Sequence, residues 1–213
     1  MNVEKYSVKG IIDNVGMCAL PNDKICFVGS FSDPDFKNKI KETLEVNEII
    51  ETTFNGFNTL PMIACINNKL AFVPKPFLEK ELLESYGFEV IELNVPYLIG
   101  NLIIMNNKGI IFSKILKEFA PSFDAHVVEE LCGNKDVIAT QVFTNDKFFI
   151  VSPNVKSEEY QTLKEVLKVD GLITTVNYGS VFIKDGILGN NKGIILGNKT
   201  SNREYDIIYN FIS

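Results

Sequence analysis

The sequence predicts a mixed α/β (α+β) protein: a closed ring of five β-β-α-β units, with strands toward the axis and helices outside. One observation is a turn that occurs five times between apolar runs, beginning at Asn22, Asn67, Asn106, Asn145 and Asn190. Steps of 45, 39, 39 and 45 residues separate these asparagines. A near-constant period of that size is typical of stacked or ringed units. The second observation is an extra strand at the N-terminus, and the third is a missing strand in the last unit.

Each turn predicts a β-hairpin. The five turns read Asn22-Asp23-Lys24, Asn67-Asn68-Lys69, Asn106-Asn107-Lys108, Asn145-Asp146-Lys147 and Asn190-Asn191-Lys192. Asparagine and aspartate tolerate the positive φ angles that tight hairpin turns require. The flanking apolar runs then supply two strands per unit.

The first two units show the full pattern of elements. In the first, strands at residues 17–20 and 25–28 precede a helix and a strand at 48–54. Asp33 is a suitable N-cap for that helix and Pro34 a suitable first residue, while Phe36, Ile40 and Leu44 form one apolar stripe. The second unit repeats the order with strands at 62–66 and 70–73, a helix at 79–86 and a strand at 89–93.

The last three units are less uniform. The third has strands at 101–105, 109–112 and 127–131, with an irregular stretch at 113–126 that contains Pro121. The fourth has strands at 140–144, 148–151 and 172–176, with a helix at 157–167. The fifth has strands at 185–188 and 193–196, then a helix that opens with a capping box between Ser201 and Glu204.

The N-terminal strand at residues 3–8 completes the ring. The fifth unit lacks a third strand, and residues 3–8 have no helix of their own, so pairing the two accounts for both facts and removes open sheet edges. We therefore expect a single domain, 1–213, with repeats at about 15–56, 60–98, 99–137, 138–180 and 181–213 plus 3–8.

Composition narrows the class of function. The chain has 213 residues, 46% of them hydrophobic and 23% charged, and a net charge of −6. An acidic chain is poorly suited to a mainly phosphate-driven grip on nucleic acid. Glu4, Lys5 and Lys9 interrupt any apolar signal core, and no run has the roughly 18 apolar residues of a membrane helix. We expect a cytoplasmic protein without membrane contact.

The sequence offers little for catalysis, metal or cofactor binding. The four cysteines, Cys18, Cys26, Cys65 and Cys132, lack C-x-x-C spacing, and no phosphate-binding glycine loop occurs. The only histidine, His126, lies six residues before Cys132, a pairing that could suggest a nucleophile. The acidic groups around Glu79, Glu129 and Glu158–Glu159 are interpreted as solvated faces. A binding protein without cofactor or small-molecule substrate is favoured over an enzyme.

Ring symmetry indicates where a binding surface lies. Residues six positions before each turn asparagine are equivalent: Gly16, Pro61, Gly100, Ala139 and Lys184. The next residues should circle one face of the ring, exposed where each unit begins: Met17, Met62, Asn101, Thr140 and Asp185. The alternative, that these residues merely start strands, stays open.

Two segments resemble the archaeal translation initiation factor 6 family. The segment Thr175-Val176-Asn177-Tyr178-Gly179-Ser180, followed by Gly186 and Asn190-Asn191-Lys192-Gly193, is similar to the start of that family's fifth repeat. Leu98-Ile99-Gly100-Asn101 resembles the start of its third repeat. The family fold is a five-fold pseudosymmetric α/β propeller, the pentein architecture, which agrees with the repeat order of the whole chain.

The resemblance implies a translation initiation and ribosome biogenesis factor. Such a protein binds the large ribosomal subunit at its subunit-joining face, near the sarcin-ricin loop, and sterically blocks the small subunit. The implied partners are ribosomal proteins, with rRNA left open, and the protein should be a monomer without a cofactor. Expected contact residues are Gly100, Asn101, Met17, Met62, Thr140, Asp185 and Asn177, with Asn101 foremost because it matches the family's contact-face asparagine.

Some segments depart from the family pattern. They are Thr59-Leu60-Pro61, Asp136-Val137-Ile138-Ala139 and residues 199–202. A diverged paralogue that binds something other than the ribosome is therefore one alternative. A guanidine-modifying enzyme of the same propeller architecture is another, although that group uses a late cysteine and none follows Cys132 here.

Overall fold

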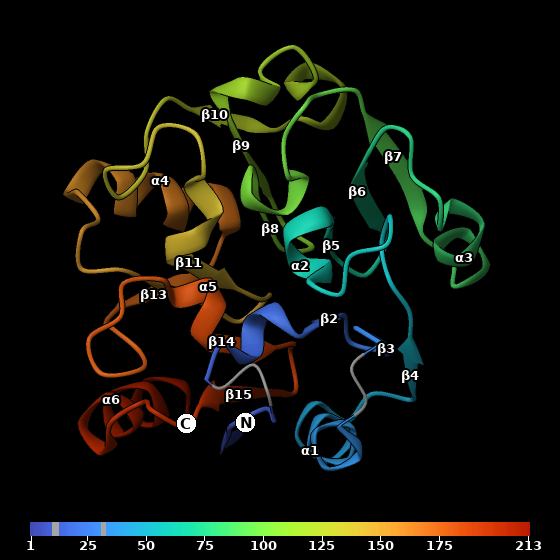
Figure 1. Cartoon of the computed structure of the whole chain (residues 1–213). Helices are drawn as coiled ribbons and strands as arrows, with labels where there is room; N and C mark the ends of the chain where they lie inside the picture. Colours follow the sequence, from blue (N-terminus) through green and yellow to red (C-terminus); the bar gives the residue numbers. More distant parts are fainter. Residues whose placement is uncertain (10–12, 31–32) are drawn as a thin grey trace.

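Five three-stranded sheets surround one axis in the computed structural model, which describes residues 1–9, 13–30 and 33–213 (Figure 1). The sheets are β2 (Ala19–Pro21), β3 (Ile25–Val28) and β4 (Glu48–Glu51); β5 (Cys65–Ile66), β6 (Leu70–Pro74) and β7 (Glu89–Leu93); β8 (Ile103–Met105), β9 (Ile110–Ser113) and β10 (His126–Val128); β11 (Val142–Thr144), β12 (Phe148–Val151) and β13 (Asp170–Ile173); and β14 (Ile187–Gly189), β15 (Gly193–Gly197) and β1 (Asn2–Tyr6). The predicted five-fold α/β architecture is confirmed.

Every sheet has the same pairing. The first two strands form an antiparallel hairpin, and the third strand pairs in parallel with the second. The first strands, β2, β5, β8, β11 and β14, line a narrow axial cavity of ≈ 120 Å³. A parallel pair needs a crossover connection, which is usually a helix. This requirement places the helices at the outside of the ring, as Figure 1 shows for α1, α3, α4 and α6.

The N-terminal strand closes the ring. Strand β1 pairs in parallel with β15, in a register that runs from Asn2 opposite Gly193 to Tyr6 opposite Gly197. The fifth unit therefore takes its third strand from the N-terminus, as predicted, and the two termini lie close together in Figure 1.

Four units have an outer α-helix. These are α1 (Pro34–Leu44), α3 (Lys80–Ser85), α4 (Ser157–Leu167) and α6 (Asn202–Ile212). The Asp33 side chain caps α1 by accepting from the Phe36 N–H, and Ser201 and Glu204 form the predicted capping box of α6. The third unit instead has two short 3₁₀ helices, η3 (Lys114–Leu116) and η4 (Ala120–Phe123), because Pro121 and the left-handed Asp124 interrupt the segment.

The five turns lock together at one end of the axis. Each leading asparagine accepts two backbone N–H groups of its own turn, as Asn190 does from Lys192 at 2.9 Å and Gly193 at 3.1 Å. The second residue of every turn donates its backbone N–H to the side chain of the next turn's second residue. The pairs are Asp23 to Asn68, Asn68 to Asn107, Asn107 to Asp146, Asp146 to Asn191 and Asn191 to Asp23. The turns thus form a closed ring of hydrogen bonds.

The hydrophobic core lies between neighbouring units, in five clusters. One cluster joins Phe27 and Phe54 of the first unit to Leu60, Phe77 and Leu83 of the second. A fully buried phenylalanine occupies the central strand in four units: Phe27, Phe72, Phe112 and Phe149. Burial of a large apolar side chain contributes about 1.5–3 kcal/mol. Each unit is therefore stabilised mainly by its neighbours, as expected for repeats that cannot bury their faces alone.

The predicted strand starts are wrong by two or three residues in every unit. The residues expected to open the strands form one helical turn instead: η1 (Val15–Met17), α2 (Leu60–Ile63), η2 (Ile99–Asn101), η5 (Ile138–Gln141) and α5 (Ile183–Gly186). The predicted third strands of units one, three and four also end too late, since β4 stops at Glu51, β10 at Val128 and β13 at Ile173.

Candidate partner-binding face

The five one-turn helices form a second ring around the axis. Each helix contacts the next, in the order η1, α2, η2, η5, α5 and back to η1. Because each helix immediately precedes the first strand of its unit and each asparagine turn follows that strand, the two rings lie at opposite ends of the axis. Figure 1 shows α2 and α5 close to the centre of the molecule.

Two glycines permit the close packing of these helices. A Cβ atom built on Gly16 would lie 1.9 Å from the Lys184 carbonyl oxygen, and one on Gly100 would lie 2.0 Å from that of Pro61. No real side chain tolerates such distances. These two positions therefore require glycine because backbone meets backbone there, not because of an unusual φ angle.

The structure brings five predicted site residues together. Met17, Met62, Asn101, Thr140 and Asp185 occupy equivalent places in the five one-turn helices, and each is half-buried instead of fully exposed as expected. Gly100 directly precedes Asn101 in η2 and is buried. These six residues define what we call the contact ring. Whether a partner binds there stays a prediction.

The polar residues of the contact ring differ in the hydrogen bonds and electrostatic surroundings of their side chains. Thr140 Oγ1 donates to the Val137 carbonyl oxygen at 3.2 Å. Burial raises the pKa of Asp185, and the neighbouring Lys184 ammonium opposes this change. Asn101 Nδ2 and Oδ1 have no hydrogen-bond partner among the residues that the structure describes. The Asn101 amide is therefore available to a partner without breaking an internal contact.

Asn177 lies outside the contact ring. It adopts a left-handed conformation with a φ of 46°. Its Nδ2 donates to the Asp13 carbonyl oxygen at 2.9 Å, and its Oδ1 accepts from Thr200 Oγ1 at 3.2 Å. These bonds connect the end of the fourth unit to the fifth unit and to the segment just before the first, which gives Asn177 an internal structural role. Its role in binding stays untested.

Sequence reasoning missed a set of exposed apolar residues beside the contact ring. Leu98, Val137 and Phe182 directly precede η2, η5 and α5, and they are 40%, 40% and 51% exposed. Tyr97 and Tyr178 are exposed in the connections before η2 and α5, and Phe57 is exposed in the connection before α2. The sequence feature that could have revealed them is a large apolar residue within a polar loop. Exposed apolar groups near polar ones are typical of protein-binding surfaces.

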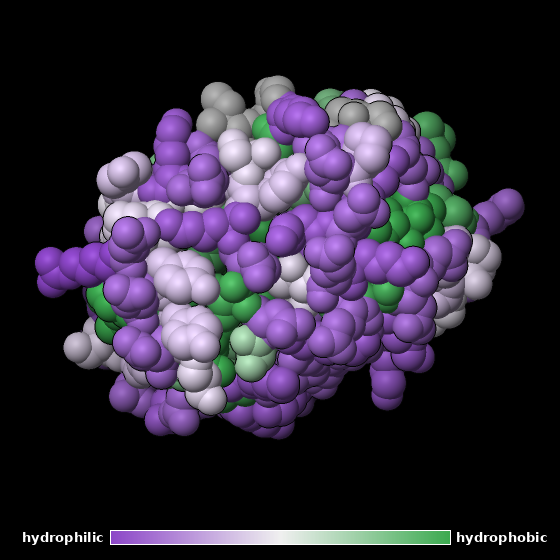
Figure 2. Space-filling model, turned by 90° about the horizontal axis from the view of Figure 1, so that it is seen from below, coloured by the Kyte–Doolittle hydropathy of each residue, from purple (hydrophilic) through white to green (hydrophobic). Residues whose placement is uncertain are grey.

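One outer edge of the ring has a mainly polar surface. Seen from the side that carries α6, the termini and α1, the surface is mainly hydrophilic, with hydrophobic areas interrupted by polar side chains (Figure 2). Tyr205 and Tyr209 of α6 stack on each other at 5.9 Å, and Lys5 lies over the Tyr205 ring.

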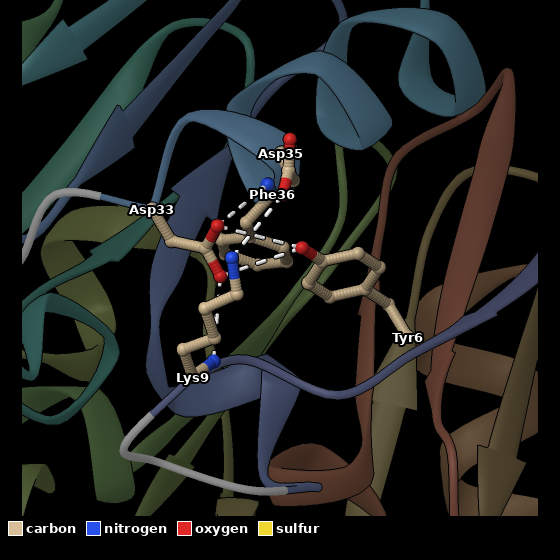
Figure 3. Close-up of polar contacts among 5 residues, drawn as sticks. All are labelled: Tyr6, Lys9, Asp33, Asp35 and Phe36. Atoms are coloured by element: carbon tan, nitrogen blue, oxygen red, sulfur yellow. Dashed lines mark hydrogen bonds and ion pairs between the residues drawn. The ribbon is translucent and has the colours of Figure 1, made fainter.

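Carboxylates join neighbouring units around the ring. In Figure 3, Asp33 accepts from the Lys9 and Phe36 backbone N–H groups, both at 3.3 Å, while Tyr6 Oη lies 3.4 Å from it. A carboxylate at the start of the outer helix thereby holds the connection that leaves the preceding third strand. Ion pairing of Lys9 with Asp35 adds an exposed contact at 3.3 Å.

The same device recurs in three other units. Glu79 accepts from the Asn55 N–H, Glu159 from the Cys132 N–H, and Glu204 from the Gly179 and Tyr178 N–H groups. The interpretation of Glu79 and Glu159 as merely solvated residues was therefore wrong. Charged residues at the start of a helix are usually exposed to solvent, which suggested a solvated face. The N–H groups that these two side chains accept lie 24 residues from Glu79 and 27 residues from Glu159 in sequence.

The Cys132–His126 pair lacks the environment of a nucleophile. Burial and, to a lesser extent, the nearby Glu159 carboxylate raise the pKa of the Cys132 thiol to about 12, whereas a reactive cysteine needs a lowered pKa. His126 lies exposed at the start of β10. Across residues 1–9, 13–30 and 33–213, no three His, Cys, Asp or Glu side chains converge to hold a metal ion.

Comparisons with known proteins match nearly the whole length of this chain. The eIF-6 family model matches residues 3–211. Translation initiation factor 6 of Sulfolobus acidocaldarius is 29% identical over 217 aligned residues, covering 96% of each chain. The protein of the same name from Staphylothermus marinus is 30% identical, covering 90% of this chain and 89% of the relative. That of Methanocaldococcus jannaschii is 26% identical, covering 92% of each.

None of the helices in the described part of the chain combines the length and hydropathy that crossing a membrane requires.

Proposed function

Because the chain belongs to the eIF-6 family, we propose that it binds the large ribosomal subunit at the subunit-joining face and sterically prevents association with the small subunit. In this role it acts as a translation initiation and ribosome biogenesis factor. The relatives that it resembles over nearly their full length carry the name translation initiation factor 6. The proposal extends that role to this protein.

The contact ring is the observation that carries the proposal. Five equivalent half-buried side chains surround the axis on one face, and the Asn101 amide among them has no internal partner within the described residues. Exposed Leu98, Val137 and Phe182 border this face. Apolar and amide groups of this kind suit a protein surface, so the main partner is a ribosomal protein, with rRNA near the sarcin-ricin loop as a secondary neighbour.

Occlusion needs no chemical step. A monomer of 213 residues that occupies the joining face excludes the small subunit by its volume alone. The net charge of −6 favours contacts with a basic ribosomal protein over a phosphate-driven grip on rRNA. We place this activity in the cytoplasm, where subunits join.

A sucrose gradient tests the proposal. Purified protein is mixed with separated large and small ribosomal subunits at low salt, and its distribution is read by immunoblot. We expect it to co-sediment with the large subunit, not with the small one, and to lower the yield of joined ribosomes. Protein that stays at the top of every gradient would refute ribosome binding and leave the alternative of a non-ribosomal paralogue.

Asn101→Ser tests the contact ring. The change removes the amide without burying a new group, so we expect about tenfold weaker binding to the large subunit, equivalent to about 1.4 kcal/mol. The melting temperature should stay within about 2 °C of wild type, because the change breaks no side-chain hydrogen bond of this half-buried residue within the described part of the chain. Asn210→Ser, at an exposed position of α6, is the matched control. Equal loss of stability and binding would make Asn101 a structural residue.

A further inference from the structure

Lys184 differs from its equivalents in the other four units. The second residue of each one-turn helix is Gly16, Pro61, Gly100, Ala139 or Lys184. Four of these side chains are absent or short. Lys184 alone is long enough to reach across the axis, and it lines the axial cavity.

The Lys184 ammonium is held by two backbone carbonyl groups from other units. Its Nζ donates to the Pro61 carbonyl oxygen at 3.1 Å and to the Gly100 carbonyl oxygen. The first of these residues belongs to α2 and the second to η2, whereas Lys184 itself belongs to α5. One side chain therefore connects three of the five helices.

The two carbonyl groups belong to the peptides that precede contact-ring residues. The Pro61 carbonyl is bonded to the Met62 nitrogen, and the Gly100 carbonyl to the Asn101 nitrogen. Rotation of either peptide would move both its carbonyl oxygen and the following residue. Because the Asn101 side chain has no hydrogen-bond partner in the described part of the chain, its position depends on this backbone.

No ion pair of Lys184 is found among the described residues, and its two acceptors are neutral. Burial lowers the pKa of Lys184, while Cys65 and Asp185 act in the opposite direction. A half-buried ammonium without a carboxylate partner contributes little to folding by itself, since an apolar side chain of similar volume is often neutral or stabilising where a charge is partly desolvated.

We propose that Lys184 is a positioning residue of the contact ring, which fixes the Pro61–Met62 and Gly100–Asn101 peptides from across the axis. This inference rests on the proposed function for its biological meaning. Whether Lys184 holds the two peptides can be tested without any assay of ribosome binding.

Amide hydrogen exchange of Lys184→Met provides the structural test. The Met62 N–H donates to the Thr59 carbonyl oxygen and the Asn101 N–H to that of Leu98, both at 3.0 Å. The Met17 N–H makes the equivalent bond to Asn14, also at 3.0 Å, and serves as an internal control. We expect exchange at Met62 and Asn101 to rise at least tenfold while exchange at Met17 changes less than twofold. Equal acceleration at all three amides, or none at any, would overturn the proposal.

Binding of the same variant to the large ribosomal subunit tests the functional part. We expect about tenfold weaker co-sedimentation than wild type, with Lys147→Met at an exposed turn as control. Unchanged binding despite faster exchange would overturn the positioning role. If the wild-type protein itself fails to bind, the proposed function fails, whereas the exchange data still decide whether Lys184 holds the two peptides.

A second variant covers the case in which Lys184→Met does not fold. Lys184→Arg keeps a cationic donor at the same position. Protection at Met62 and Asn101 close to that of wild type would support the proposal, and loss of protection at these amides together with Met17 would contradict it.

Discussion

The carboxylate of Glu204 should be a major local source of stability at the junction between the fourth and fifth units. Its Oε1 accepts from Thr175 Oγ1 at 2.6 Å and from the Gly179 N–H at 2.9 Å. Its Oε2 accepts from the Ser201 N–H at 2.7 Å and from the Tyr178 N–H at 3.3 Å. Glu204→Gln keeps the size of the side chain but replaces one of these acceptors with an NH₂ group. That group faces the Ser201 and Tyr178 N–H groups in one amide orientation, and the Gly179 N–H and the Thr175 hydroxyl in the other.

The magnitude follows from those four bonds. A hydrogen bond to a charged group contributes about 1.5–3 kcal/mol, and the two bonds to the lost oxygen are the ones that fail. Allowing for some rearrangement, we expect the free energy of unfolding to fall by about 3 kcal/mol. A domain of this size loses about 2–4 °C per kcal/mol, so the melting temperature should drop by about 6–12 °C.

The pH dependence gives an independent check. Burial opposes ionisation of Glu204, but the hydrogen bonds from Thr175, Gly179 and Ser201 outweigh it, so the pKa of this carboxyl lies below its usual value. A lowered folded pKa means that the stabilisation is complete above the unfolded pKa of about 4.3 and is lost as pH falls through the folded value. The difference between Glu204→Gln and wild type should therefore shrink below about pH 4.

Differential scanning calorimetry at pH 7 and across the acid range measures both effects. Glu165→Gln, at an exposed position of α4, is the matched control and should shift the melting temperature by less than about 2 °C. A Glu204→Gln melting temperature within about 2 °C of wild type, or a difference that does not depend on pH, would refute the reasoning.

Two further predictions concern the asparagine turns and the cysteines. Asn190→Ala removes two accepted and two donated hydrogen bonds of a buried amide, so the free energy of unfolding measured in urea should fall by about 3 kcal/mol. Asn67→Ala removes three hydrogen bonds at a half-buried site and should lower the free energy of unfolding by about 1 kcal/mol less. Equal losses for the two variants would contradict this ranking. Burial raises the pKa of Cys18 and Cys132 to about 12 and that of Cys65 to about 11, so Ellman's reagent at pH 8 should label less than about one thiol in the native protein and all four after unfolding. Rapid native labelling that is lost in Cys132→Ser would reopen the question of a nucleophile.

Local sequence rules predicted the elements whose partners are near in sequence. The asparagine turns bond to N–H groups two and three residues on, and Asp33 and Ser201 each cap a helix that begins at the next residue. The closing strand followed from counting, because only residues 3–8 could supply the strand that the fifth unit lacks.

Elements fixed by contacts across the axis were not predictable. A one-turn helix has no measurable period, so residues such as Ile183 and Ile187 fit an apolar strand equally well. The need for glycine at Gly16 and Gly100 comes from carbonyl groups of another unit. Equivalence under five-fold symmetry nevertheless placed Met17, Met62, Asn101, Thr140 and Asp185 together, since symmetry carries long-range information that local patterns lack.

The pairing of β1 with β15 makes the order of synthesis matter for folding. Asn2 leaves the ribosome early, yet its strand partner begins at Gly193, near the other end of the chain. The ring cannot close until β15 has been made, and such long-range pairing is slow. During that interval β1 has an unpaired edge, and Val3, which is 8% exposed in the closed ring, lacks its cover from the fifth unit. A chain truncated before β15 therefore cannot form the fifth sheet and cannot close the ring.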